Sequence, residues 1–439
     1  MRSLLRPLAA IAIAAAPSAT AGAQTVDPAI GSAVDRLTPQ IVDIRHRVHQ
    51  NPELGNREFK TAELIAAHLR ALGLEVKTGV AHTGVVATLR GGRPGPLVAV
   101  RADIDALPVT ENTPYPFRST VRTQYLGQEV GVMHACGHDV HVAVQLGVAS
   151  VLAGMRDQVP GTVQFIFQPA EEGAPPGEKG GAALMLEEGI WSRTKPTAVF
   201  GLHAAAEMPV GTVGVGSGPL MASADQFVAT LSGKQAHGAQ PQESIDPVVM
   251  AAQAVLALQT IRARNLSPFA PSVVTVGMIH GGERNNIIPA EVRLTGTVRT
   301  FDPEVQDVIE RRMREILDGV ARAAGGKYAL DYVRGYPVTV NDSALVARMQ
   351  PVVMRAAGAA NVRPFAMTTG AEDFSYFARA TPGYFFRLGT QKEGTTSGGH
   401  HTPTFQADDS AIPVGMRVMS TLLLEYLRGE SRAATGGGP

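Results

Sequence analysis

Apolar residues recur along the chain in short continuous runs that alternate with longer amphipathic segments. Continuous apolar runs predict buried strands, and apolar residues spaced three and four apart predict helices. The strands are expected at 97–102, 162–167 and 198–202, and the helices at 41–48, 64–72 and 140–155. Strands alternating with helices favour an α/β fold whose central strands are buried. Catalytic groups should gather where such strands end.

The pattern changes after about Gly218. The next elements are expected to be a strand, a helix, two strands and a helix, at 227–232, 247–262, 273–279, 291–299 and 303–323. This order is typical of a small ferredoxin-like α+β unit inserted into a larger domain. We therefore expect a catalytic domain in two parts, residues 24–217 and 335–430, around an inserted unit at 218–334.

A last amphipathic helix is expected to close the catalytic domain. Its apolar stripe consists of Ile412, Met416, Met419, Leu423 and Leu427. Ser410 is the expected N-cap, and Gly429 is expected to end the helix. The Gly- and Ala-rich tail, residues 431–439, is expected to be disordered.

The first residues have the pattern of a signal peptide. Arg2 and Arg6 precede the apolar run 8–16, and Ala21-Gly22-Ala23 forms a small-residue cleavage signal. We expect residues 1–23 to be removed and the mature protein to be secreted, in the bacterial periplasm. No later segment reaches the roughly 18 uninterrupted apolar residues of a membrane span, so none is expected in the mature protein.

Overall charge limits the classes of binding partner, and the cysteine content limits the possible disulfides. The 439 residues include 39 basic and 39 acidic side chains, which gives no sign of a nucleic acid or anionic membrane partner. Cys136 is the only cysteine, so no internal disulfide can form. On an exported chain this thiol is either buried and inert or held as a metal thiolate.

The densest group of reactive side chains is the segment 134–141, which contains three histidines, Cys136 and an aspartate. A thiolate and an imidazole two residues apart, Cys136 and His138, can face one ion at a strand-to-helix junction. Surface histidines around a core cysteine are the alternative interpretation. Gly137 would let the backbone turn tightly between them.

A pair of glutamates, Glu171 and Glu172, directly follows a predicted strand. Adjacent carboxylates there need neutralisation, and two metal ions would supply it while one carboxylate stays free to move protons. His203 ends another strand, and His401 lies in a Gly-rich loop. The full candidate ligand set is Cys136, His138, Glu172, His203 and His401. Five ligands suit two ions that share one ligand and a bridging water, with Glu171 as the general base.

Several motifs, taken in order, resemble the M20 metallopeptidase and amidohydrolase family. The branch is that of hippurate hydrolases, auxin-conjugate hydrolases and N-acyl amino acid amidohydrolases. The motifs stand at 46–54, 101–108, 136–139, 169–173, 370–374 and 401–403. The resemblance implies a mixed-sheet metallopeptidase domain with an inserted lid and dimerisation domain. It also implies that the five candidates are the metal ligands and that Glu171 is the base.

The resemblance adds two residues of the inserted unit. His237 matches a histidine that polarises the substrate carbonyl, often in the partner subunit's site, and Asn286 matches a substrate-contacting position. A homodimer through the inserted unit is therefore implied. His401 is preferred to His400 because the family's ligand stands two residues before a proline.

The expected activity is hydrolysis of the amide bond of a small N-acyl amino acid. A carboxypeptidase or dipeptidase acting on short peptides is the alternative, because the same machinery attacks either amide. A non-enzymatic binding protein is disfavoured by the complete ligand set and Glu171. A thiolate with three imidazoles favours zinc, while manganese, cobalt or nickel would also fit.

Overall fold

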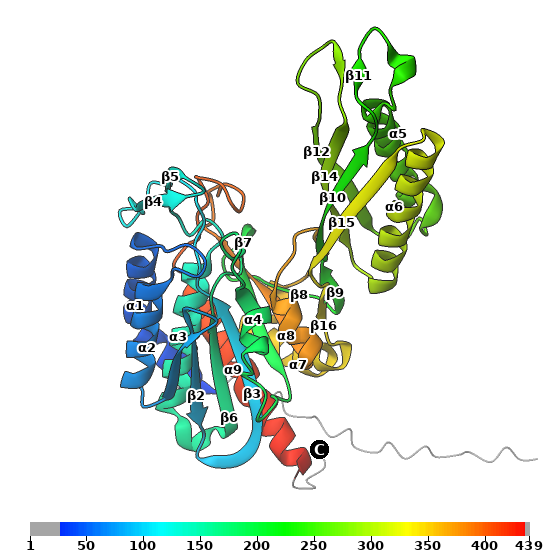
Figure 1. The fold of residues 1–439 in the computed structure, drawn as a ribbon. Helices are drawn as coiled ribbons and strands as arrows, with labels where there is room; N and C mark the ends of the chain where they lie inside the picture. The colour runs from blue at the N-terminus through cyan, green and yellow to red at the C-terminus, as the bar shows by residue number, and fades with distance from the viewer. Residues whose placement is uncertain (1–26, 435–439) are drawn as a thin grey trace, which may run out of the picture.

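The computed structural model of the chain describes residues 27–434. Within this range the larger unit is built on one eight-stranded mixed sheet (Figure 1), in the order β1-β2-β6-β3-β7-β18-β8-β17. Strands β6, β3, β7 and β18 run parallel to one another, and β2 and β8 join them antiparallel. The strands are β1 (Glu75–Val80), β2 (Gly84–Arg90), β3 (Arg93–Asp103), β6 (Pro160–Gln168), β7 (Val199–Pro209), β8 (Val213–Val215), β17 (Val362–Pro364) and β18 (Gly383–Gln391).

Helices cover both faces of this sheet, which confirms the predicted α/β class with a mixed sheet. Alternate strand residues enter two different cores: Val98 and Val100 pack with α1, α3 and α9, whereas Ala99 packs with α4 and α8. The helices are α1 (Pro28–Gln50), α2 (Phe59–Ala71), α3 (His138–Gly154), α4 (Gly181–Glu187), α7 (Ser343–Ala357), α8 (Phe374–Ala380) and α9 (Ala411–Ala434). Nearly every residue of α3 is buried, which explains its continuous apolar composition.

A second unit, residues 224–336, stands beside the larger one (Figure 1). It is a four-stranded antiparallel sheet in the order β12-β14-β10-β15. Two helices cover one face and share a separate core with it. The elements are β10 (Ala224–Ser232), α5 (Pro247–Thr260), β12 (Ser272–His280), β14 (Glu291–Thr300), α6 (Pro303–Ala323) and β15 (Lys327–Tyr336).

Three two-stranded pairings complete the described strands. Strands β9 (Gly218–Met221) and β16 (Thr339–Asn341) pair where the chain leaves and re-enters the larger unit. Strands β11 (Ala236–His237) and β13 (Ile287–Ile288) pair within the second unit. The third pairing is a hairpin of the larger unit, β4 (Arg122–Tyr125) with β5 (Gln128–Gly131).

Two sequence predictions need correction. The predicted set omitted β15, which adds an edge strand to the second sheet and extends two residues beyond the expected boundary at 334. Helix α9 does not end at Gly429, which has an ordinary helical backbone, and residues 431–434 are helical rather than part of a disordered tail. Residues 435–439 and the predicted signal peptide 1–23 lie outside the described residues.

Ser410 directly precedes α9, as predicted, but its hydroxyl donates a hydrogen bond to the Asp408 carboxylate. Among the described residues, no helix combines the length and the apolarity that crossing a membrane requires.

A matched pair of leucines tests the separate core of the second unit. Leu258 is fully buried in that core, whereas Leu256, two residues earlier on α5, is 73% exposed. Leu258→Ala should lower the free energy of unfolding by about 2–5 kcal/mol, because it removes buried methyl groups and leaves a cavity. Leu256→Ala should change it by less than about 0.5 kcal/mol. Denaturant unfolding of both variants measures the difference, and equal effects would contradict this assignment of the core.

Candidate metal and active site

The candidate ligands gather at the carboxyl ends of the central parallel strands. Cys136 and His138 flank Gly137, whose φ of 90° places it in the left-handed region immediately before α3. A Cβ at Gly137 would lie 2.6 Å from the Cβ of Ala204 on β7. Only glycine therefore allows the turn before α3 to approach the strand that carries His203 so closely.

The structure brings all five predicted ligands and Glu171 into one cluster. Cys136 Sγ lies 3.5 Å from His203 Nε2. The carboxylate of Glu172 lies 3.1 Å from His401 Nε2 and 3.9 Å from His138 Nε2. Three overlapping sets of ligand atoms lie within 4.8 Å of one another: Cys136, Glu172 and His401; His138, Glu171 and Glu172; Cys136, His203 and His400.

The hydrogen bonding of the two ring nitrogens of His138 shows that this cluster fits metal ions. Its Nδ1 lies 2.9 Å from the backbone oxygen of Asp105, which fixes the ring, whereas its buried Nε2 has no hydrogen-bond partner. A ring fixed through one nitrogen, with the other nitrogen free beside a carboxylate, is the usual arrangement of a metal-binding histidine. Such an orphaned buried nitrogen is otherwise unfavourable.

The electrostatics of Cys136 and His203 agree with this fit. Burial and then the Glu172 carboxylate raise the pKa of the Cys136 thiol well above its usual range, so the thiolate needs a cation to form. Burial and then the neighbouring His141 hold the pKa of His203 well below its usual range. His203 is therefore a neutral imidazole, the form that binds metals.

Glu171 is placed differently from Glu172. It is buried, and its Oε1 lies 3.4 Å from the backbone nitrogen of Asp373, which donates to it. Burial first, and then the carboxylates of Glu372 and Glu172, raise the pKa of Glu171 well above its usual range. A carboxylate with a raised proton affinity is suited to accept a proton near neutral pH.

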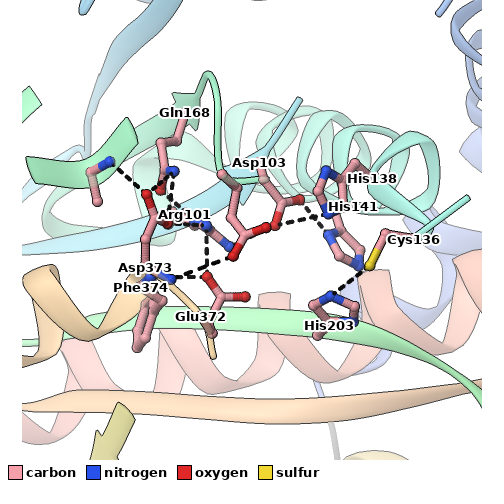
Figure 2. A network of polar contacts seen from close by, with 12 residues as sticks. Arg101, Asp103, Cys136, His138, His141, Gln168, His203, Glu372, Asp373 and Phe374 are labelled. Atoms are coloured by element: carbon pink, nitrogen blue, oxygen red, sulfur yellow. Dashed lines mark hydrogen bonds and ion pairs between the residues drawn. The ribbon is translucent and has the colours of Figure 1, made fainter. Parts of the chain in front are cut away.

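The buried guanidinium of Arg101 binds three carboxylates beside the candidate site. Its guanidinium donates to Gln168 at 2.7 Å and to Asp103, Glu372 and Asp373 at 2.8 Å each. Figure 2 shows Arg101 among these three carboxylates and Cys136 facing His203. The sequence motifs contained Arg101 and its three carboxylate partners, but sequence reasoning assigned them no role. A charged pair at the end of a buried apolar strand was the signal that could have revealed them.

Asp103 also fixes His141, whose Nδ1 contacts its carboxylate, while the Nε2 of His141 accepts a hydrogen bond from the backbone of Ala204 at 2.7 Å. Both nitrogens of His141 are therefore engaged. It positions β7 beside the cluster and is not a free ligand.

A cleft with a volume of about 680 Å³ opens on the cluster. Residues of both units line it, including Arg299 of β14 and Tyr336 at the end of β15. The Tyr336 hydroxyl donates to the backbone oxygen of Glu171 at 2.6 Å. The chain segment that leaves the second unit therefore holds the backbone of the candidate base.

Arg299 is a half-buried cation that sequence reasoning missed, because an arginine at the end of an alternating strand is ordinary. Its Nη1 donates to Thr297 Oγ1 at 2.8 Å and to the backbone oxygen of Val298 at 3.4 Å. In the described part of the chain no carboxylate lies within 4.0 Å of it as an ion-pair partner. Arg299 thus brings to the cleft a positive charge that has no direct ion-pair partner in the described part of the chain.

The structure does not bring His237 and Asn286 into this cleft within one chain. Both side chains are exposed, and their loops are joined by a hydrogen bond from the backbone nitrogen of Gly238 to the backbone oxygen of Asn286 at 2.8 Å. Figure 1 shows β11, which carries His237, at the end of the second unit far from the large sheet.

Comparison with known proteins agrees with this geometry. The family model described as peptidase family M20/M25/M40 matches residues 99–425. The chain belongs to this M20 family. It is 36% identical over 397 residues to "Thermostable carboxypeptidase 2" of Saccharolobus solfataricus, covering 90% of this chain and 97% of the relative. It is 38% identical to "N-acetyl-L-cysteine deacetylase" of Bacillus subtilis, and the match covers 86% of this chain and 85% of that relative.

A solved M20 structure supports the two-ion interpretation. It is the YXEP protein of Bacillus subtilis, described as a dinuclear metal-binding peptidase, with 33% identity and a TM-score of 0.76 over 90% of this chain and 99% of that one. The M20 assignment makes the protein a hydrolase of amide bonds, and its ligand groups suit two divalent ions.

Proposed function

We propose that this M20 hydrolase cleaves the amide bond of N-acyl amino acids, with Glu171 as the general base. The observation that carries the proposal is the composition of the cleft. A thiol, imidazoles and carboxylates converge on one side, and the unpaired Arg299 lies on the other. Such a cleft can hold a small anion with its amide beside the base.

Two divalent ions held by Cys136, His138, Glu172, His203 and His401 would supply Lewis-acid activation of the substrate carbonyl and of water. Glu171 takes the proton from the attacking water and later delivers it to the departing amine. The thiolate and imidazoles favour zinc, and manganese is the next choice, followed by cobalt or nickel.

The cleft also supports a blocked amino group in the substrate. Arg299 provides a partner for the carboxylate of the amino acid. Among the described residues that line the cleft, the only carboxylates are Glu171 and Glu172, and both have other roles. A free ammonium group would therefore find no anionic partner, which disfavours dipeptides. A carboxypeptidase activity on short peptides is the second candidate, because two relatives carry that name.

Hydrolysis of a matched substrate panel tests this proposal. N-acetyl and N-benzoyl amino acids should be cleaved with higher kcat/KM than dipeptides with the same C-terminal residue. The carboxamide of each good substrate should be poor, because it no longer pairs with Arg299. Arg299→Gln should remove most of the preference for the carboxylate. Faster cleavage of dipeptides, or of peptides alone, would contradict the proposed substrate class.

The two glutamates should differ in metal content. Glu171→Gln should keep near-normal metal content and lose about 10²–10⁴-fold in turnover, because it removes a proton carrier but no ligand. Glu172→Gln should lose metal as well. Elemental analysis beside turnover measures both, and the reverse result would exchange the roles of the two residues.

We further propose that the protein is a homodimer through the second unit, with His237 and Asn286 reaching the partner's cleft. The exposed position of His237, far from its own cluster, supports this proposal. Each complete site would then need both chains, with His237 stabilising the oxyanion and Asn286 contacting the substrate.

Complementation tests the shared site. His237→Ala should lose about 10²–10³-fold in activity, as expected for one oxyanion donor, and Glu171→Ala should be inactive. Co-refolding the two variants should make about half of the dimers hybrid, with one intact site each, and restore roughly a quarter of normal activity. Heterodimers verified by mass but without recovered activity would place His237 outside the partner's site.

Secretion to the periplasm after cleavage behind Ala23 is also proposed. Its support is the order of charged, apolar and small residues at the N-terminus.

A further inference from the structure

The loop before α9 presents two consecutive histidines to the cluster. In an extended chain, consecutive side chains point to opposite faces. His401 has a φ of 65°, in the left-handed region that non-glycine residues rarely adopt. Its backbone nitrogen donates to the Ala135 oxygen at 2.8 Å, which holds the loop against the segment that carries Cys136. The unusual backbone lets both His400 and His401 face Cys136.

His400 reaches the opposite end of the cluster from His401. Its Nδ1 lies 3.4 Å from Cys136 Sγ, and its ring centroid lies 5.4 Å from that of His203. The ligand atoms of Cys136, His203 and His400 all lie within 4.8 Å of one another. His401 instead lies beside Glu172.

Each end of the cluster needs enough ligands to hold an ion. Cys136 belongs to both ends of the cluster, and Glu172 and His401 complete one end, toward which His138 Nε2 also faces. Without His400, the other end would have only Cys136 and His203. A catalytic zinc ion usually has three protein ligands and one open position.

His400 also has the support that a ligand needs. Its Nε2 lies 3.8 Å from a carboxylate oxygen of Glu207, which favours the tautomer with the proton on Nε2 and leaves Nδ1 free beside Cys136. Glu207 is in turn held by Arg387 at 2.8 Å. A carboxylate behind one ring nitrogen orients the other toward an ion and makes the ligand more basic.

We propose that His400 is a sixth metal ligand, which binds one ion together with Cys136 and His203 while His401 binds the other ion with Cys136 and Glu172. The inference rests on the two-ion site of the proposed function. It divides the adjacent histidines between the two ions.

Metal titration of the whole protein tests the inference without an activity measurement. Zn²⁺ and Co²⁺ binding would be measured by calorimetry and by the cobalt–thiolate absorption band, with folding checked by circular dichroism. His400→Ala should bind one ion as the wild type does and the second ion more than about 10-fold more weakly, the lower end of the effect of losing even an outer partner of a ligand. His280→Ala, which removes an exposed histidine on β12, is the matched control and should bind both ions normally.

Double variants identify which ion is affected. His203→Ala with His400→Ala should still bind one ion tightly, because both residues serve the same ion. His400→Ala with His401→Ala should bind neither ion tightly. Two ions bound by His400→Ala with wild-type affinity, or one tight ion in the second double variant, would overturn the assignment. Glu207→Gln leaves the imidazole of His400 in place and should weaken binding of the same ion by a smaller factor. This variant keeps the test valid if His400→Ala fails to fold. A wild-type protein that binds fewer than two ions would instead defeat the proposed two-ion function.

Discussion

The edge of the sheet that carries the site depends on the buried guanidinium of Arg101. This side chain joins the end of β6 through Gln168, the end of β3 through Asp103, and the loop before α8 through Glu372 and Asp373. Breaking a buried ion pair by removing one partner typically destabilises by about 3–5 kcal/mol, because an uncompensated charge is left. The ends of β3 and β6 and the loop before α8, which border the candidate site, therefore depend on this one cation.

One guanidinium does not neutralise the acids around it. Burial raises the pKa of Asp373 to about 7 even with Arg101 beside it, and burial likewise raises the pKa of Glu372. Glu172 adds further negative charge, and Glu171 and Cys136 add more when they ionise. The zero net charge of the whole chain conceals this local excess. Two divalent ions would balance it, so the crowding of buried carboxylates, which is unfavourable by itself, would give the cluster its affinity for cations.

Hydrophobic periodicity predicted the elements whose apolar faces are buried, and it failed where burial is partial. The stripe from Ile412 to Leu427 is buried as predicted. Strand β15 alternates half-buried and exposed residues at the edge of its sheet, so it gave no apolar signal. The end of α9 extends beyond the core, where a glycine with a helical backbone does not stop the helix. Spacing predicted Cys136 and His138, which lie two residues apart. It could not predict the contact between Arg101 and Glu372, which are 271 residues apart.

The cleft lies between the two units, so residues of both units contribute to it. Arg299 belongs to the second unit, whereas Glu171 belongs to the larger one, and both line the cleft. Tyr336 connects them, because it ends β15 and its hydroxyl binds the backbone oxygen of Glu171. Movement of the second unit would therefore change both the distance from Arg299 to Glu171 and the hydrogen bond that holds the Glu171 backbone. In the proposed function, substrate binding at Arg299 would therefore be coupled to the position of Glu171 through the Tyr336 hydroxyl.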